Sequence, residues 1–353
     1  MVPGGFKKTT RQERGQPCPR ELDPKPATRG HGCPRSHLES VLVMLNVRAM
    51  IACGAVLLVF AQSRPSLAAG TFSIATYNLE NYLDEPVGHR PRKSEAAKAK
   101  VRESIRALHP DVLAMQEMGS TNALLELRAS LNSEGLDYPY WEHVTGFDTN
   151  IHVAILSRMP FAARRPHTNE GFLLRGRRFH VSRGFAEVDV QVNAQYQFTL
   201  LAAHLKSRRE VPEADEAELR EQEAMVLREI VDARLKANPN VNLIALGDFN
   251  DLKDSRPVKT IVGRGKNALL DVRPAERNGD DPKALDNRAS PRNVTWTYYF
   301  AKDDTYSRID YMLLSQGMSR EWQSEGTQVL ALANWGVASD HRPIVATFVA
   351  EDR

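Results

Sequence analysis

Short β-rich runs alternate with helical stretches from Thr71 to the end of the chain, and this alternation restricts the fold more than any other feature of the sequence. The β-rich runs are dense in Val, Ile, Tyr, Phe and Leu and are bounded by turn residues, which is typical of strands. Strands are predicted at Phe72–Tyr77, Asp111–Gln116, Ile151–Ser157, Phe185–Val192, Phe198–His204, Asn242–Gly247, Thr295–Phe300, Ile309–Leu314, Gln328–Ala331 and Ile344–Val349.

Three stretches show the apolar spacing of helices, namely Ser94–Leu108, Thr121–Leu131 and Ala214–Lys236. The acidic run Glu210–Glu229 is expected to form the exposed face of the third helix. No linker divides the body, and the polar segment Asp271–Arg292 is expected to be a surface loop. So many strands with several helices in one domain predict a layered α/β body.

The first 69 residues differ from the rest in composition. They hold all three cysteines, and they carry ten Lys/Arg against four Asp/Glu, whereas the body carries 37 Lys/Arg against 40 Asp/Glu. Residues 70–353 therefore have no disulfide framework, no Cys-ligated metal and no thiol nucleophile. Because the body is mildly acidic, it is not a protein that coats nucleic acid through bulk positive charge.

The leader predicts export. Residues 1–43 are rich in Pro, Gly and Arg without apolar periodicity, so we expect disorder, or a translation start that really lies at Met44 or Met50. Residues 44–69 have the parts of a signal peptide: Arg48, the apolar run Ala49–Ala61 and a small-residue end. A membrane anchor is the alternative, although 13 apolar residues fall short of the roughly 20 that span a bilayer. Residues 70–353 would then be a secreted or periplasmic catalytic domain, monomeric and without a stable membrane partner.

Polar residues that can take part in catalysis or bind a metal stand at the ends of the predicted strands. Rigid strand ends can bring side chains together in one crevice. The set is Asn78, Glu117, His204, Asp248, Asn250, Asp310, Asp340 and His341. Its carboxylate and amide oxygens suit a hard cation such as Mg²⁺ or Mn²⁺. Imidazoles and amides can hold a phosphate and stabilise its developing charge, so the set predicts metal-assisted hydrolysis of a phosphate ester.

Each motif alone has an ordinary structural explanation. Gly247–Asn250 is also a good turn sequence, and Ser339-Asp340-His341 could cap a helix or form a corner. His204 could be a half-buried histidine of an apolar strand. The ordered series is more specific than any member. It comprises Ala75–Asn78, Pro110–Glu117, Ala154–Arg158, His204–Ser207, Gly247–Asn250, Ser307–Tyr311 and Ser339–Pro343.

This series resembles the endonuclease/exonuclease/phosphatase superfamily, which includes pancreatic-type deoxyribonucleases, abasic-site endonucleases, inositol-polyphosphate phosphatases and neutral sphingomyelinases. The resemblance implies a four-layer α/β sandwich of two packed mixed sheets with helices outside. It implies that Glu117 is the main metal ligand, with Asp340 beside the metal and Asn78 positioning metal and phosphate. It further implies that Asp248 orients or deprotonates the attacking water and that Asn250 holds a phosphate oxygen.

The resemblance also implies a role for each of the two histidines. His341 would contact the scissile phosphate, and Asp310 would hydrogen-bond His341. His204 would grip phosphate or protonate the leaving oxygen, and it places the chain nearer the deoxyribonucleases and sphingomyelinases, because abasic-site endonucleases usually carry Tyr there. The Glu that pairs with this histidine in deoxyribonucleases is absent, and Asn150 is the expected substitute.

Basic and aromatic residues supply further candidates. Arg183 and Lys206 are expected to contact substrate phosphate. The arginine-rich stretch Arg164–Arg183 either grips a phosphate backbone or forms a solvated loop. Trp296, Tyr298 and Tyr299 are expected to pack rather than to stack on bases.

The sequence thus predicts an exported, divalent-metal-dependent phosphodiesterase, most simply a nuclease. A lipid phosphodiesterase like the sphingomyelinases and a small-phosphoester phosphatase are alternatives with the same chemistry. A catalytically silent binding module is an alternative of another class, disfavoured because all eight polar positions hold suitable residues.

Overall fold

The computed structural model describes residues 70–276 and 295–353 of the chain. The predicted boundaries at residues 43 and 69 lie outside the described residues and stay predictions, as does the predicted signal peptide. The predicted loop Asp271–Arg292 is described only as far as residue 276, where it begins with two short strands, β11 (Leu270–Asp271) and β12 (Ala275–Glu276).

Two mixed sheets form the body. The first has the strand order β12-β16-β17-β1-β2-β4-β3 and the second the order β11-β15-β10-β9-β8-β5. Parallel pairs join β1 to β2 and β9 to β10, and most other neighbours are antiparallel. The bounds not yet given are β16 (Trp322–Val329), β17 (Ile344–Val349), β1 (Thr71–Tyr82), β2 (Val112–Met118), β4 (His152–Ser157), β3 (Tyr140–Val144), β15 (Asp310–Leu314), β10 (Leu243–Asp248), β9 (Gln197–His204), β8 (Phe185–Gln191) and β5 (Phe161–His167).

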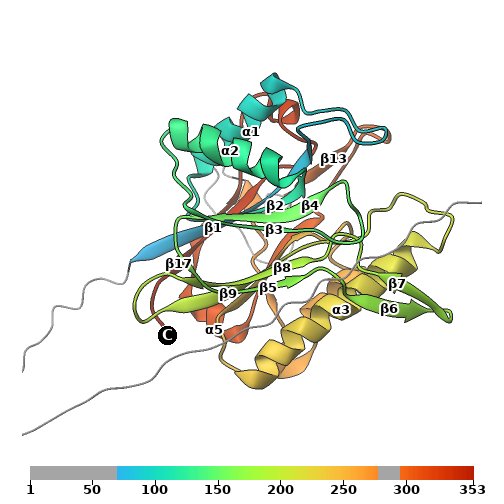
Figure 1. The fold of residues 1–353 in the computed structure, drawn as a ribbon. Helices are drawn as coiled ribbons and strands as arrows, with labels where there is room; N and C mark the ends of the chain where they lie inside the picture. The colour runs from blue at the N-terminus through green and yellow to red at the C-terminus, as the bar shows by residue number, and fades with distance from the viewer. Residues whose placement is uncertain (1–69, 277–294) are drawn as a thin grey trace, which may run out of the picture. The chain divides into compact units, whose positions relative to one another are not determined.

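The sheets pack face to face and carry helices on their outer faces, which confirms the predicted four-layer α/β sandwich (Figure 1). Alternating side chains of both sheets fill the central core, where Phe72 of β1 stacks on Phe198 of β9 with 5.1 Å between ring centroids. A second core lies between the first sheet and helices α1 (Glu95–Leu108) and α2 (Thr121–Ser133). A third lies between the second sheet and helices α3 (Glu216–Ala237) and α4 (Arg256–Val262).

The three predicted helices form where their capping residues start them. The side chains of Ser94, Ser120 and Asp215 each accept a hydrogen bond from a backbone N–H of the first turn. The short helix α5 (Gln316–Glu321) begins in the same way at Ser315. In the part of the chain that the structure describes, no helix combines the length and the apolar character needed to cross a bilayer.

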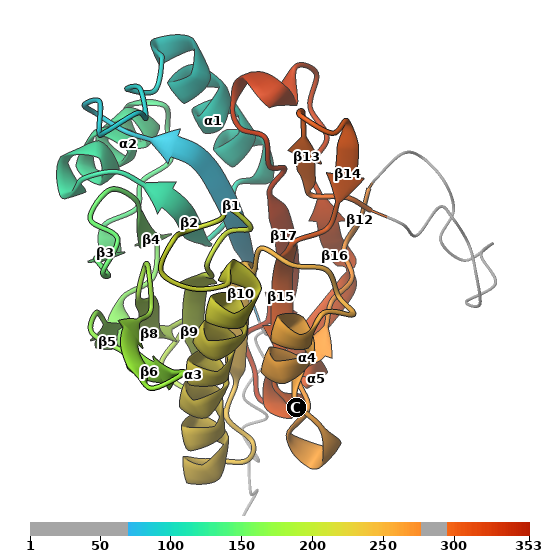
Figure 2. The same cartoon turned by 90° about the vertical axis from the view of Figure 1, so that its right-hand side faces the viewer.

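Two hairpins outside the sheets extend the body. One consists of β6 (Gly171–Leu174) and β7 (Arg177–His180), and the other of β13 (Tyr298–Phe300) and β14 (Thr305–Ser307). Figure 2 shows β13 and β14 at the same upper end of the body as α1. The predicted strand Thr295–Phe300 is therefore only β13, and the predicted strand Gln328–Ala331 begins earlier, at Trp322 of β16.

Gly247 carries the tightest backbone contact in the second sheet. Its φ is +130°, and a Cβ at this position would lie 2.0 Å from the carbonyl oxygen of Ala203 in the neighbouring β9. We expect Gly247→Ala to lower the free energy of unfolding by at least about 2 kcal/mol, because it adds a backbone clash to an unfavourable φ. Urea unfolding measures the change, with Gly70→Ala as a control in open space; equal stability of the two variants would contradict this account of β10.

Candidate active site

The predicted polar residues meet at one end of the sheet pair. Asn78 lies in β1 of the first sheet, and Asp248 ends β10 of the second. Nδ2 of Asn78 donates a hydrogen bond to Oδ2 of Asp248 over 2.9 Å, so the two sheets are joined directly at this point. His204 ends β9 and Asp310 opens β15, and each is the register partner of Asp248. All four side chains are buried.

A bulge between β1 and β2 sets the direction of the neighbouring acids. The register of the two strands shifts after Asn78. Glu80, Asn81 and Glu117, all at this bulge, have φ values of 46°, 55° and 59°. Bulges redirect side chains beside active sites, and left-handed residues other than glycine gather where function requires the strain. The backbone of β1 and β2 thus leaves regular strand geometry at the site.

His341 lies between two carboxylates. Its Nδ1 atom donates to Oδ2 of Asp310 over 2.9 Å, and its Nε2 atom lies 3.7 Å from Oδ2 of Asp248. Ser339 fixes this segment to the first sheet, because its hydroxyl donates to the carbonyl oxygen of Asn78 over 2.8 Å. The predicted pairing of His341 with Asp310 is present in the structure.

These carboxylates keep His341 protonated. Burial lowers the pKa of His341, but the negative charges of Asp310 and Asp248 and the hydrogen bond to Asp310 outweigh burial, so the pKa lies well above its usual range. Burial raises the pKa of Asp248, although the positive charge of His341 opposes the rise. The site therefore holds an imidazolium beside a carboxylate of increased basicity.

His204 faces Asp248 from another side, with 3.5 Å between its Nε2 atom and Oδ2 of Asp248. Burial lowers its pKa far below the usual range, and the charges of Arg183 and His341 lower it further, so His204 is neutral. Its Nδ1 atom is buried and has no hydrogen-bond partner among the described residues. The expectation that Asn150 takes this place is therefore wrong.

Asn250 holds the end of the Gly247–Asn250 turn. It has a φ of 54°, its backbone N–H donates to Oδ1 of Asp248 over 2.8 Å, and its side-chain amide donates to the carbonyl oxygen of Leu205 over 3.0 Å. The left-handed turn thus directs one hydrogen bond to the last residue of β10 and one to the residue that follows β9. Its predicted contact with a phosphate oxygen stays a prediction.

The two basic residues predicted to bind phosphate hold the loop after His204. Nη1 of the buried Arg183 donates to the carbonyl oxygen of Leu205 over 3.0 Å. Nζ of Lys206 donates to two carbonyl oxygens that follow it in the same loop. Both cations lie close to the site, but in this structure they bind backbone, so their contact with substrate stays a prediction.

Glu223 of α3 supports the same loop and was missed by the sequence analysis. Its carboxylate is buried and accepts hydrogen bonds from the backbone N–H groups of Lys206, over 2.6 Å, and Ser182, over 2.8 Å. The acidic run to which it belongs indicates an exposed helix face, and the other acids of the run are exposed or partly exposed. Only the structure shows that Glu223, unlike the other acids of the run, is buried.

A carboxylate edge formed by Glu80, Glu117 and Asp340 borders the buried part of the site. Burial raises the pKa of Glu80, and the charge of Glu117 raises it further against the opposing charge of Lys93. Burial also raises the pKa of Asp340, to about 6, and the charges of Glu80 and Glu117 add to the effect while His341 opposes it. Glu80 was not predicted, because its position depends on the bulge.

Two cations of the segment between β1 and α1 approach this edge. Nζ of Lys93 donates to the carbonyl oxygen of Glu80 over 2.9 Å, and Nη1 of Arg90 lies 3.8 Å from Oε2 of Glu117. Burial lowers the pKa of Lys93, and the three carboxylates oppose that shift. The segment therefore supplies positive charge where the acids concentrate negative charge.

The carboxylate edge fits a hard divalent cation. Three carboxylates so close together are stabilised by a cation between them, and oxygen ligands are those that Mg²⁺ and Mn²⁺ prefer. A second group, Asp248, Asp310 and His341, has ligand atoms within 4.8 Å of one another. There the hydrogen-bonded imidazolium already supplies the positive charge, so the carboxylate edge is the better candidate.

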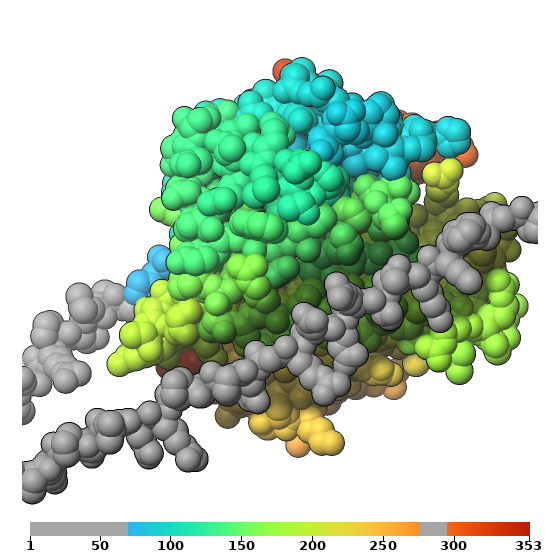
Figure 3. All heavy atoms as spheres, viewed as in Figure 1, coloured from blue at the N-terminus to red at the C-terminus, as the bar shows by residue number. Residues whose placement is uncertain are grey.

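The arginines of Arg164–Arg183 lie mainly in strands rather than in a loop. Arg165 of β5 forms ion pairs with Glu187 and Asp189 of β8, and Arg175 pairs with Glu218 of α3 over 2.5 Å. The β6–β7 hairpin, light green at the right of Figure 3, is exposed. Acids thus neutralise part of this stretch, and the solvated-loop prediction is wrong about its secondary structure.

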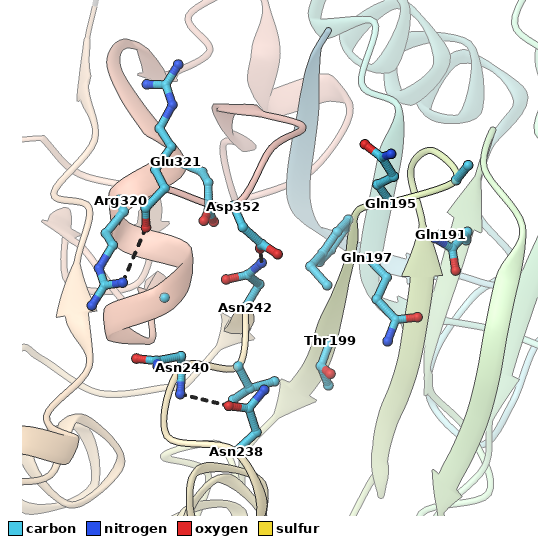
Figure 4. A pocket seen from close by; sticks show the side chains of 15 residues that line it. Gln191, Gln195, Gln197, Thr199, Asn238, Asn240, Asn242, Arg320, Glu321 and Asp352 are labelled. Carbon is cyan, nitrogen blue, oxygen red and sulfur yellow. Dashed lines mark hydrogen bonds between the residues drawn. The ribbon is translucent and has the colours of Figure 1, made fainter. Parts of the chain in front are cut away.

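A polar pocket of about 660 Å³ lies away from these residues, where β9 begins and α5 ends. Amide side chains such as those of Gln197, Asn240 and Asn242 line it together with Glu321 and Asp352 (Figure 4). It contains none of the predicted site residues.

Comparisons with known proteins identify the family to which this fold and site belong. The model of the Endonuclease/Exonuclease/phosphatase family matches residues 75–341. A comparison with curated proteins finds no match. Among solved structures, truncated TDP2 of Caenorhabditis elegans is 17% identical, with a TM-score of 0.53 and 79% of this chain and 98% of that chain covered.

Two further structures have the same fold. The human Nocturnin catalytic domain, solved with a bound sulfate anion, is 16% identical, with a TM-score of 0.56 and 80% and 95% of the two chains covered. Sphingomyelinase C of Streptomyces griseocarneus is 19% identical, with a TM-score of 0.53 and 79% and 100% covered. At these identities the structures show the fold alone, whereas the family match includes every predicted site residue from Asn78 to His341. The chain therefore belongs to the endonuclease/exonuclease/phosphatase family and is a metal-dependent phosphoester hydrolase.

Proposed function

We propose that the protein hydrolyses phosphodiester bonds of nucleic acids by attack of an activated water on phosphorus. The observation that carries this proposal is the position of His341, whose ring lies 2.9 Å from Asp310 and 3.7 Å from Asp248, beside the carboxylate edge. An imidazolium binds a phosphodiester anion, and a basic carboxylate next to it can accept a proton from water. No side chain of the site needs to form a covalent bond with phosphorus.

The roles follow from charge and hydrogen bonding. Asp248 accepts the proton of the attacking water, while Asn78 keeps the Asp248 carboxylate in place. His341 donates a hydrogen bond to the phosphate oxygen on which negative charge grows, and the neutral His204 offers a second, uncharged contact. Glu117, Asp340 and Glu80 would hold Mg²⁺ or Mn²⁺, which neutralises phosphate charge and increases the acidity of bound water.

Two arginines, one partly exposed and one exposed, favour a polyanionic substrate. The guanidinium groups of Arg90 and Arg208 border the site, with 29% and 51% of their side chains exposed. Nη1 of Arg90 approaches Glu117, and Nε of Arg208 donates to the carbonyl oxygen of Asn250 over 3.2 Å. Cations in these places can contact the phosphates that flank the scissile one. Export to the periplasm or the medium, predicted from residues 44–69, and a monomeric state are parts of the same proposal.

A panel of substrates tests this function. With Mg²⁺, we expect the purified protein to cleave single-stranded or double-stranded DNA, or RNA, faster than sphingomyelin vesicles or a sugar phosphomonoester. Faster cleavage of sphingomyelin or of the phosphomonoester would agree with the proposed hydrolytic mechanism but would show that nucleic acid is not the preferred substrate. Correct folding without hydrolysis of any substrate would support the silent binding module and contradict the proposal.

A further inference from the structure

A pocket of about 740 Å³ adjoins the carboxylate edge. Glu80 and Asp340 line it at one side, and aromatic residues of β13 and of the turn at Trp335 line it elsewhere. Tyr298 and Phe300 stand on the same face of β13, with 6.3 Å between their ring centroids and 26° between their planes. The pocket is therefore continuous with the catalytic site and has planar apolar walls.

The aromatic walls are held rigidly against the catalytic segment. The backbone N–H of Tyr299 donates to the carbonyl oxygen of Asp340 over 2.9 Å, and that of Arg342 donates to the carbonyl oxygen of Thr297 over 2.6 Å. The ring of Tyr298 lies 4.7 Å from the ring of His341. A ligand in the pocket is therefore close to a phosphate that His341 holds.

Trp335 has its own support. Its ring packs against Trp296 at 5.0 Å between centroids, and the guanidinium of Arg342 lies over Trp296 at 3.5 Å. Phe300, by contrast, is 37% exposed, although a large apolar ring gains free energy when it is covered. Hence one wall is packed from behind, while the other leaves apolar surface that a ligand can cover.

The polar residues of the pocket identify the ligand class. Lys302 and Asn334 line it and are exposed, so they can donate hydrogen bonds to the edge of a planar ring or to a neighbouring phosphate. The turn between β13 and β14 reads Ala301-Lys302-Asp303-Asp304, and two acids at a hairpin tip disfavour insertion into a lipid surface. Aromatic faces with donors at the rim are typical of base-binding sites in proteins that bind single-stranded nucleic acid.

We propose that this pocket binds one nucleobase of a single-stranded nucleic acid beside the scissile phosphate. The base stacks on Phe300 and Trp335, and this contact places the neighbouring phosphodiester against His341 and the carboxylate edge. The inference rests on the proposed nuclease function and specifies its substrate: the nucleotide beside the cleaved bond must be unpaired, because a base inside a duplex cannot enter the pocket.

Hexathymidine substrates with one cleavable linkage test the inference. Every linkage except the central one is a methylphosphonate, and in two analogues the base on one or the other side of the central phosphate is replaced by an abasic tetrahydrofuran. For the wild-type protein with Mg²⁺ we expect one analogue to have a KM about tenfold above that of the parent, the size of a single base–aromatic stack.

Variants locate the effect. In Phe300→Ala and Trp335→Ala we expect the KM ratio of analogue to parent to fall toward one, because the parent loses its stack. Asp303→Ala is the control, since Asp303 is exposed at the tip of the same hairpin and does not line the pocket. It should keep the wild-type ratio, whereas a loss as large as that in Phe300→Ala would assign the effect to hairpin stability and overturn the inference.

The remaining outcomes separate the inference from the proposed function. Cleavage of all three hexanucleotides with equal KM in the wild type overturns the base pocket and leaves the nuclease function intact. No cleavage of any of them, together with hydrolysis of sphingomyelin vesicles that Trp335→Ala impairs, overturns both and assigns the pocket to a lipid.

Discussion

Replacing His341 with Gln is expected to lower kcat for phosphodiester hydrolysis by about 10³-fold without unfolding the protein. Removing one preorganised charged donor from a buried site costs about 10²–10³ in rate. Glutamine keeps a hydrogen-bond donor but not the positive charge. The decrease in kcat therefore measures mainly the contribution of the positive charge. Steady-state kinetics measure kcat, and the midpoint of urea unfolding shows whether the fold is intact.

The pH dependence distinguishes the charge of His341 from its shape. Asp310 raises the pKa of His341, so Asp310→Asn lowers that pKa. Activity that requires the imidazolium is lost as the pH rises through this pKa, and the alkaline limb of the rate profile should therefore move to lower pH in Asp310→Asn. An unchanged alkaline limb, or a kcat for His341→Gln within tenfold of the wild type, would refute the assigned role.

Replacing Glu117 with Gln is expected to weaken Mg²⁺ or Mn²⁺ binding by at least about tenfold and to lower kcat by a factor of at least 10² at a fixed metal concentration. The carboxylate edge then loses one of three negative charges, and the remaining amide oxygen is a poorer ligand. Isothermal titration calorimetry with each metal alone measures affinity independently of turnover.

Glu103→Gln is the control for this experiment. Glu103 is an exposed acid of α1 that pairs with Lys100 over 2.8 Å, and its removal should change metal affinity by less than twofold. Equal affinities for the wild type and Glu117→Gln would mean that the cation binds elsewhere. In that case the group Asp248, Asp310 and His341 becomes the alternative, and Asp310→Asn should then weaken binding instead.

The sequence predicts the layers and the strand-end residues well, because apolar runs and their polar ends are local patterns. It misses β5, whose residues Phe161–His167 include Arg164 and Arg165, since the strand is at an edge of its sheet and its arginines pair with residues far away in the chain. It also misses α4 and the hairpin β6–β7, which are too short for a periodic signal.

Site residues that depend on tertiary contacts are the ones that sequence patterns do not reveal. Glu80 joins the carboxylate edge only because of a bulge, and Glu223 faces the sheet only because α3 packs in one rotation. Tyr298 has the pattern of a packing residue, and nothing in the alternation of a strand shows that this face meets His341. Whether Asn150 reaches His204 also depends on tertiary contacts, and the Nδ1 atom of His204 has no hydrogen-bond partner among the described residues.

The most direct test of the central claim is cleavage of circular single-stranded DNA by the purified protein with Mg²⁺, with Mn²⁺ and with a chelator, beside the His341→Ala variant. We predict cleavage with either metal, none with the chelator and none above background in the variant, because the carboxylate edge and the imidazolium act on the same phosphate. Cleavage that survives both the chelator and the loss of His341 would show that this site does not carry the reaction.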